Sequence, residues 1–513
     1  MKRSSLLCLI LVAFWAGACS GGGGTTVTTP PPNNGFSNNS LDGQYAFSMS
    51  GTDASTGSEV PFARVGSFIA NGEGGITGGV EDVNLILGGG GANELGFTGG
   101  SYTVNSDGRG TLSLIDSTGT LTFSIALTSS SSGYLVDMPT DGLSAGNGSF
   151  VKQNPNDFLL SAFSGSYAFD FSGVDPQENP ESIVGQLVSN GNLGLSGIAD
   201  DNDGAQINGG MAGGAAISGN YNYATIASDL TNFGRGQITI GGITGVFYVV
   251  GPSQIKFMET SSGGTLAGDA FVQSNIPTTA AAISGGFVYV MGGSDTSGPF
   301  VRGGKISSSG GNLSSILVDT NNAGMQNSST ASTGTYTIDP AGTGRGTITF
   351  SASGLKDPFT YVFYMVSPTQ AYIQDQSQGI VEDGSLLAQG SGTITDSSLA
   401  GAYALNWSGV LSTSSGSGEE DVIGETTLTS GSFTGNTDLN EFASGKQFTD
   451  VSVTGALTLS SDPTGHDTFK LTFQTNPSTS AVAFAYVANN NTVLLMTTQS
   501  TRIAAGVMTP QTP

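Results

Sequence analysis

The residues of this chain that could carry chemistry are few, and most of them recur. The 513-residue sequence has one histidine, whereas catalytic triads, most general bases and most zinc sites use imidazole. Three arginines stand in Gly-Arg-Gly steps, and the internal repeats place the histidine at the same point. We expect a structural role, in which each pairs with a carboxylate or with carbonyls at a strand end; guiding an anionic or sugar ligand is the alternative. The four positions are Arg109, Arg235, Arg345 and His466.

Carboxylates also recur, after the third predicted strand of each repeat. Adjacent acids at such a place predict a solvated acidic loop, and Glu419-Glu420-Asp421 similarly predicts an exposed hairpin loop. The run Asp201-Asn-Asp203-Gly is similar to a fragment of a calcium loop but lacks the bidentate glutamate of an EF-hand. Weak Ca²⁺ binding at these acids is therefore the alternative, and no other cofactor is expected. The metal candidates are Asp200, Asp201 and Asp203.

The elements that must position these residues come in four copies. An opening segment of the type Leu-x-Gly-x-Tyr recurs at a spacing of roughly 120 residues, which is the size of one domain. In the first copy the larger side chains Tyr45, Phe47 and Met49 alternate, and a period of two predicts a strand with one buried face. The copies lie at 41–51, 163–173, 283–293 and 399–409.

Each repeat predicts about eight strands joined by short turns, such as Asn71-Gly72 and Asp107-Gly108. Short sequential connections favour a small up-and-down antiparallel β-barrel, which also removes exposed sheet edges; a β-sandwich is the alternative. The fold class is therefore all-β, with four tandem modules. We expect them at 41–155, 161–275, 281–393 and 397–513.

The N-terminus has the pattern of a secretory signal peptide over residues 1–18. Lys2 and Arg3 precede a short apolar core. The following Ala16-Gly-Ala-Cys19 resembles the lipobox of bacterial lipoproteins, in which the cysteine is lipidated. The resemblance implies a lipid anchor on Cys19; a plain signal peptide with a free thiol is the alternative. Residues 19–40 then predict a flexible Gly/Thr/Pro tether.

Charge and cysteine content exclude several classes of protein. The chain has 14 Lys+Arg against 39 Asp+Glu, a net charge of −25, so neither nucleic acid nor an anionic membrane would attract it by charge. Cys8 lies inside the signal peptide and Cys19 at its cleavage point, so no internal disulfide is expected after cleavage. Only 10% of all residues are charged, and the low-charge polar surface that this predicts suits an extracellular protein.

The whole chain resembles tandem-repeat bacterial surface lipoproteins of uncharacterised function. The Leu-x-Gly-x-Tyr opening and the Asn71-Gly72 to Gly78 step are also similar to the first strands of avidin-like and lipocalin-like barrels. Avidin-type pockets use several tryptophans, and beyond the leader only Trp407 remains here, so biotin binding does not carry over. Ser20 after the cysteine is typical of lipoproteins sorted to the outer membrane.

These observations predict a non-enzymatic lipoprotein of the outer membrane, exported by the general pathway. Its expected roles are adhesion, contact with an extracellular glycan or surface polymer, or envelope structure, on the cell surface or facing the periplasm. Repeated weak sites would gain avidity. The alternatives are a carrier of small apolar ligands in the barrel lumens and, least favoured, a carboxylate-based glycoside hydrolase.

Overall fold

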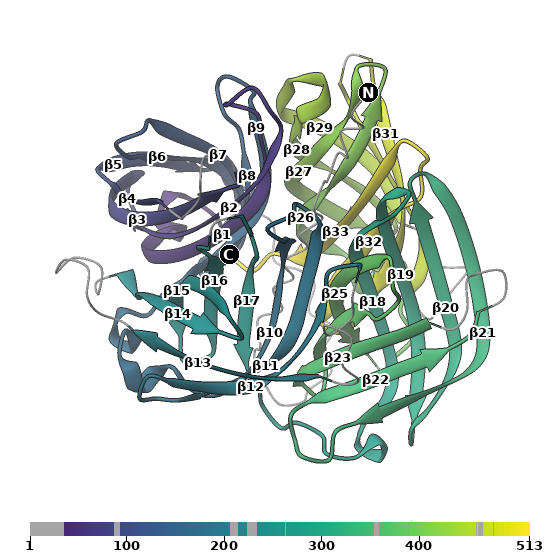
Figure 1. The fold of residues 1–513 in the computed structure, drawn as a ribbon. Helices are drawn as coiled ribbons and strands as arrows, with labels where there is room; N and C mark the ends of the chain where they lie inside the picture. The colour runs from purple at the N-terminus through teal and green to yellow at the C-terminus, as the bar shows by residue number, and fades with distance from the viewer. Residues whose placement is uncertain are drawn as a thin grey trace.

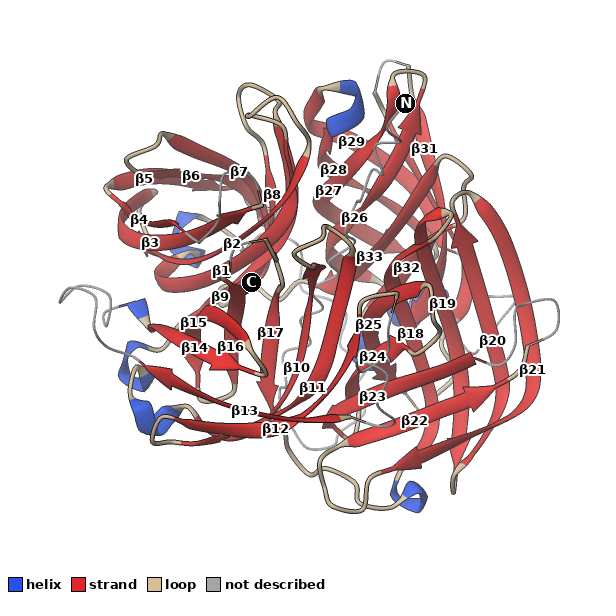
Figure 2. Ribbon diagram, viewed as in Figure 1, coloured by secondary structure: helices blue, strands red, loops and turns tan. Residues whose placement is uncertain are grey.

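The computed structural model describes residues 35–86, 93–205, 214–222, 233–261, 263–352, 359–390, 392–457, 459, 465–475 and 477–513. The leader, the lipidation candidate Cys19 and most of the predicted tether lie outside these residues. Figure 2 shows that strands dominate the described chain and that its helices are short. The short 3₁₀ helices are Asn38–Ser40, Pro155–Asp157, Leu160–Ala162, Ala280–Ala282, Asp396–Leu399, Phe442–Ser444 and Asn489–Asn491.

The strands form four consecutive groups, called here barrels 1 to 4. Barrel 1 contains β1(Asp42–Asp53), β2(Val60–Asn71), β3(Gly75–Leu85), β4(Asn93–Phe97), β5(Gly99–Val104), β6(Arg109–Ile115), β7(Thr120–Ser129), β8(Ser132–Asp137) and β9(Ser144–Lys152). Barrel 2 contains β10(Ser164–Val174), β11(Pro180–Asn190), β12(Gly194–Asn202), β13(Ala215–Asn222), β14(Arg235–Ile240), β15(Ile243–Gly251), β16(Gln254–Glu259) and β17(Ala267–Val272). Barrel 3 contains β18(Ser284–Asp295), β19(Gly298–Ser309), β20(Asn312–Asn322), β21(Met325–Ile338), β22(Arg345–Phe350), β23(Phe359–Ser367), β24(Gln370–Asp375) and β25(Ile380–Ala388). Barrel 4 contains β26(Gly401–Thr413), β27(Gly416–Thr429), β28(Ser432–Glu441), β29(Lys446–Leu457), β30(His466–Phe473), β31(Thr479–Val487), β32(Val493–Thr497) and β33(Arg502–Pro510).

Each group is an up-and-down antiparallel barrel, which confirms the predicted fold class over the sandwich. Sequential strands pair with one another, and the last strand of each group returns to the first. In barrel 1 the fourth strand is divided: β3 pairs with both β4 and β5. The turn between the second and third strands reverses the chain through Gly72, whose φ of 76° favours glycine.

The opening strands are buried on both faces, whereas the sequence predicted one. The larger side chains, such as Tyr45, Phe47 and Met49, pack inside barrel 1. The small residue between them, Ala46, is also fully buried, because it packs against barrel 2. The equivalent Ala404 of barrel 4 lies in an apolar cluster shared with barrels 1 and 3. The small side chains of these strands therefore mark close packing between barrels.

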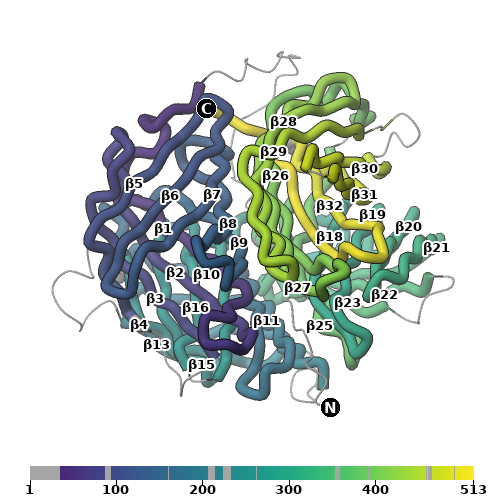
Figure 3. The backbone as a smooth tube through the Cα atoms, turned by 90° about the horizontal axis from the view of Figure 1, so that it is seen from above, coloured from purple at the N-terminus to yellow at the C-terminus, as the bar shows by residue number. Residues whose placement is uncertain are grey.

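The four barrels form a ring around a common centre (Figure 1). The opening and closing strands lie towards this centre, where the C-terminus also ends. Seen from above, β7, β8 and β9 of barrel 1 lie beside β26 and β27 of barrel 4, so the last barrel contacts the first (Figure 3). Apolar clusters join barrels 1 and 2, barrels 2 and 3, and barrels 3, 4 and 1. In the described part of the chain, no helix is both long and apolar enough to cross a bilayer.

Candidate functional sites at the junctions between barrels

The recurring aspartates lie within the third strand of each barrel, not on solvated loops. Asp82, Asp200, Asp319 and Asp438 stand at one register position on β3, β12, β20 and β28. The first three are at most 1% exposed, so the predicted acidic loops are wrong. Aspartate is disfavoured in strands, but here each side chain points outward into the next barrel, where it finds charged or polar partners.

The aspartate of barrel 1 meets the recurring arginine of barrel 2. Arg235 makes a two-pronged ion pair with Asp82, with Nε–Oδ2 and Nη2–Oδ1 distances of 2.7 and 2.6 Å. The hydroxyl of Tyr248 donates a third bond to the same carboxylate at 2.7 Å. Burial and the nearby carboxylate raise the pKa of Tyr248 well above its usual value, so this hydroxyl stays protonated.

Two further junctions repeat this arrangement. Arg345 of barrel 3 holds Asp200 of barrel 2 in the same two-pronged way, at 2.7 and 2.8 Å, and Tyr364 donates to it at 2.7 Å. His466 of barrel 4 lies 3.1 Å from Asp319 of barrel 3. Tyr486 is that carboxylate's second partner, at 2.6 Å. The histidine therefore takes the structural place of the arginine, as the repeat register indicated.

The fourth copy of the contact closes the ring. Arg109 of barrel 1 lies 3.7 Å from Asp438 of barrel 4 and 2.7 Å from Asp450 of the same barrel. Asp450 in turn donates its backbone N–H to Asp438 at 2.6 Å. Each recurring cation thus binds the barrel that precedes it around the ring, and for barrel 1 that is barrel 4.

Two more sets of polar residues repeat at the junctions, and the sequence reasoning missed both. An asparagine two residues after each aspartate donates to backbone carbonyls of the next barrel; Asn84, for example, reaches Glu259 O and Gly264 O at 2.9 and 2.7 Å. The signal was an Asp-x-Asn spacing conserved among the four internal copies. The asparagines are Asn84, Asn202, Asn321 and Asn440.

The second set is a glutamine that follows each closing strand. Gln511, for example, donates to Asp107 O and Leu127 O of barrel 1 at 2.9 and 2.8 Å. Its recurrence was visible only by comparing the ends of the repeats. Because buried amides bonded to carbonyls are directional, these contacts fix how each barrel sits on the next. The glutamines are Gln153, Gln273, Gln389 and Gln511.

The three acids considered for Ca²⁺ do not point to one place. The carboxylate of Asp200 accepts hydrogen bonds from Arg345 and Tyr364 across the junction. The next residue, Asp201, projects from the opposite face of the strand. Burial and the neighbouring Asp203 raise the pKa of Asp201 to about 6. Within the described residues, no group of three or more His, Cys, Asp or Glu is arranged to hold a metal ion. Weak Ca²⁺ binding stays a prediction.

Large side chains pack against one another inside the barrels. In barrel 4 the rings of Trp407 and Phe473, from the first and fifth strands, meet across the interior and pack edge to face with centroids 5.7 Å apart. In barrel 2 the rings of Phe171 and Phe257 stack with centroids 4.1 Å apart over Gly268 of the strand between them. Such contacts occupy interior space that a lumen ligand would need.

Buried charges accompany these rings at one end of the barrels. Arg64 in barrel 1 and Arg302 in barrel 3 pair with interior carboxylates, and barrel 2 has Ile183 at this register position. Without that cation, burial and surrounding acids raise the pKa of Glu181 to about 8. These interior charges are therefore individual to each barrel, unlike the junction contacts.

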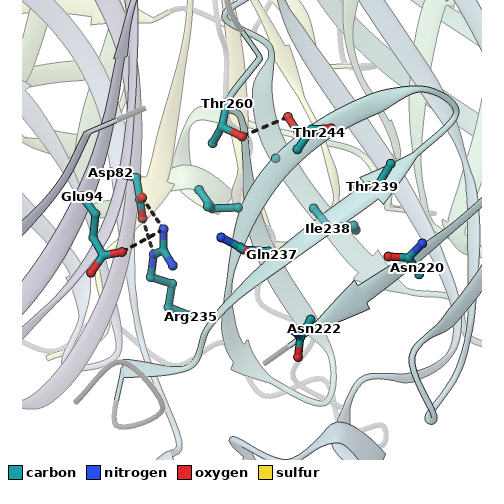
Figure 4. A pocket seen from close by; sticks show the side chains of 12 residues that line it. Asp82, Glu94, Asn220, Asn222, Arg235, Gln237, Ile238, Thr239, Thr244 and Thr260 are labelled. Carbon is teal, nitrogen blue, oxygen red and sulfur yellow. Dashed lines mark hydrogen bonds and ion pairs between the residues drawn. The ribbon is translucent and has the colours of Figure 1, made fainter. Parts of the chain in front are cut away.

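A polar groove opens beside the junction of barrels 1 and 2 (Figure 4). Its volume is about 590 Å³, within the range of ligand sites. One wall is the outer face of β13, β14 and β15, and Asp82 and Glu94 of barrel 1 stand at one end beside Arg235. Arg235 also contacts Glu94, with Nη2–Oε2 at 3.3 Å.

Comparison with known proteins yields a faint likeness only. No family model matches the chain, and no curated protein matches it. Among solved structures, it is similar to the vaccine antigen transferrin binding protein B (TbpB) of Haemophilus parasuis Hp5, as a double mutant, at 11% identity and a TM-score of 0.17, over 74% of this chain and 82% of that one. The intact Ap-TbpB, with N and C lobes, gives the same values.

Proposed function

We propose that this protein is a non-enzymatic, lipid-anchored lipoprotein of the bacterial outer membrane that presents four β-barrels as one rigid body at the cell surface. Its role is adhesion, contact with a glycan or surface polymer, or envelope structure. The observation that carries the proposal is the closed ring of repeated junctions. The residues best suited to chemistry, the recurring arginines and His466, are used to join barrels.

Rigidity suits a protein that displays a surface on a tether. Each junction combines a buried ion pair or its histidine equivalent with amide-to-carbonyl bonds and an apolar contact. Contacts of this kind hold orientation, so weak sites on different barrels keep fixed spacings. The predicted Gly/Thr/Pro tether can extend only to residue 34, because Phe36 packs into the core of barrel 1. That tether would let the ring face outward while lipid on Cys19 holds the chain.

The carrier alternative is less well supported. Side chains such as Trp407 and Phe473 touch across the barrel interior, and buried arginines with their carboxylates occupy one end of barrels 1, 3 and 4. An apolar ligand would have to displace both. The lumens resemble a packed core more than a cavity.

A glycoside hydrolase also fits poorly. The closely facing carboxyls Asp170 and Asp383 hydrogen-bond to each other at the junction of barrels 2 and 3. Glycosidases keep their two carboxyls roughly 5–9 Å apart so that the scissile bond fits between them. A pair in direct contact leaves no room for that bond.

The anchor is tested by metabolic labelling with a radioactive fatty acid, followed by protease treatment of intact cells. The expected result is a labelled, membrane-bound protein that the protease degrades from outside, and loss of label and anchorage in Cys19→Ser. An unlabelled wild-type protein free in the periplasm would refute the anchor.

The rigid ring is tested separately by small-angle X-ray scattering on the soluble Cys19→Ser chain. A compact particle of this size has a radius of gyration of about 23 Å. A much larger value, as for barrels strung on flexible linkers, would refute the single rigid body.

A further inference from the structure

The groove at the junction of barrels 1 and 2 differs from the matching faces of barrels 1 and 3. The outer face of barrel 2 that forms one wall of this groove carries three carboxamides, Asn220 and Asn222 on β13 and Gln237 on β14. Thr239 and Thr244 lie beside them (Figure 4). Asn222 and Gln237 are direct cross-strand neighbours, and Asn220 stands opposite Thr239. All three amide residues are exposed on the outer face of the barrel.

Barrels 1 and 3 place threonines where barrel 2 has Asn222 and Gln237. In barrel 1 the hydroxyls of Thr103 and Thr111 bond to each other at 2.9 Å. In barrel 3 Thr337 and Thr347 do the same at 2.7 Å. Two short hydroxyls satisfy one another, whereas two carboxamides offer additional donors and acceptors to a ligand.

The charges at the end of the groove are largely neutralised. Arg235 is tied by two bonds to Asp82 and also contacts Glu94. The Glu94 side chain keeps 29% of its surface exposed, and it accepts hydrogen bonds when ionised. A carboxylate at this place, in a chain of net charge −25, disfavours anionic ligands.

We propose that this groove is a binding site for a neutral carbohydrate unit. It would then be the site of the glycan contact in the proposed function, and the inference rests on that function. Sugar hydroxyls both donate and accept, and so do Asn220, Asn222 and Gln237, while Glu94 accepts from a hydroxyl pair. The volume of about 590 Å³ suits a short stretch of a glycan chain.

The mode of recognition follows from the lining. Among the described residues, the twelve that line the groove include no aromatic side chain, so these residues would hold the ligand by hydrogen bonds and not by ring stacking. Such a site is weak by itself, since hydrogen bonds to ligand largely replace hydrogen bonds to water. Many anchored copies on one cell would supply avidity for a polymeric glycan.

The test is titration calorimetry of the soluble Cys19→Ser chain with neutral oligosaccharides: dextran, cello-, xylo- and chito-oligosaccharides, with oligogalacturonate as the acidic comparison. We expect at least one neutral series to bind and the acidic one not to bind. The double variant Asn222→Thr/Gln237→Thr copies barrels 1 and 3 and should weaken binding about tenfold or more. The matched control Thr337→Ala/Thr347→Ala, on barrel 3, should bind as the parent does.

Each outcome decides the matter. Binding that survives Asn222→Thr/Gln237→Thr would overturn this site while leaving glycan contact elsewhere on the ring. Binding of oligogalacturonate alone would overturn the neutral ligand class. If no sugar binds, this inference is overturned, whereas the anchored rigid ring is judged by the labelling and scattering experiments. Circular dichroism spectra of the variants should match that of the parent. One variant introduces the residues that barrels 1 and 3 already have at these positions, and the other shortens two side chains on the outer face of barrel 3.

Discussion

The junction between barrels 2 and 3 and the one between barrels 4 and 1 place different chemistry at the same point. In the first, Asp170 of β10 faces Asp383 of β25, and the two carboxyls share a hydrogen bond. In the second, Asn406 of β26 faces Asn147 of β9. Asp170 and Asn406 each stand three residues after the opening-strand tyrosine, so the two pairs occupy equivalent positions.

The difference shows how one scaffold can have junctions with different proton requirements. The asparagine pair exchanges two hydrogen bonds of 2.7 and 2.9 Å and is neutral at every pH. Two carboxylates repel each other, so the aspartate pair needs a proton; burial and the facing carboxyl raise the pKa of Asp170 well above its usual value. Burial also raises the pKa of Asp383 to about 6.

The largest expected effect comes from removing a buried partner at the junction of barrels 2 and 3. In Asp200→Ala, Arg345 and Tyr364 lose their common acceptor, and we expect a loss of about 3–5 kcal/mol in the free energy of unfolding. At the junction of barrels 4 and 1, Asp450 is 75% exposed, so Asp450→Ala should cost about 1 kcal/mol or less. Urea unfolding measures both, and equal losses would show that the two ion pairs do not differ.

The second prediction converts the carboxyl pair into the amide pair. A raised pKa contributes stability that is complete below the unfolded-state pKa and is lost as pH rises through the folded-state value. For the aspartate pair this loss begins near pH ~4 and continues past pH 6. The free energy of unfolding of the variant Asp170→Asn/Asp383→Asn should exceed that of the parent by on the order of 1–3 kcal/mol at pH 8 and by little at pH 4. Thermal unfolding across this range checks it.

Other ionisable groups lie near that pair. Asp269 and Tyr372 face Asp170, and burial and the two aspartates raise the pKa of Tyr372 well above its usual value. At the other junction, burial raises the pKa of Asp421 to about 8. The stability of the variant therefore keeps some pH dependence of its own, and the informative quantity is the difference in stability between variant and parent at each pH. If this difference stays constant from pH 4 to 8, the two aspartates do not share a proton.

The third prediction is the reverse exchange. In Asn147→Asp/Asn406→Asp, the junction that closes the ring should need a bound proton between its two carboxyls. The free energy of unfolding should fall on the order of 1–2 kcal/mol below that of the parent at pH 8, and this loss should shrink towards pH 4. Scattering at the two pH values would show whether the ring also opens, as an increase in the radius of gyration at pH 8. An unchanged pH profile would mean that water reaches this pair and solvates both charges.

The smallest effect is expected from the C-terminal glutamine. Gln511→Ala removes two hydrogen bonds to barrel 1, worth about 1–2 kcal/mol together. Gln273→Ala removes the matching two bonds between barrels 2 and 3, together with the bond that Gln186 donates to Gln273 Oε1 at 2.8 Å, and serves as the comparison. Because the Gln511 replacement removes two bonds and the Gln273 replacement removes three, the loss at Gln511 should be the smaller of the two in urea unfolding. A larger loss at Gln511 would show that the closing junction is held mainly by this tail.

Much of the fold was predictable because strand signals are local. Alternating side chains such as Tyr45, Phe47 and Met49, turn glycines such as Gly72 and the fourfold recurrence of the opening segment predict small antiparallel barrels. The recurrence also indicated that His466 stands in for an arginine. The buried acids were predicted wrongly: Glu419, Glu420 and Asp421 resembled an exposed loop, yet they lie buried in β27.

The sequence by itself determined the barrels, because a period of two and short turns act over a few neighbouring residues. Only the tertiary structure decided the ring. The partner of Asp82 is Arg235, 153 positions away, and that of Arg109 is Asp450, 341 positions away. Which barrel meets which depends on the shapes of whole surfaces, and no local pattern of residues contains that information. The same dependence brings Glu94 to the amides of barrel 2 and forms the groove.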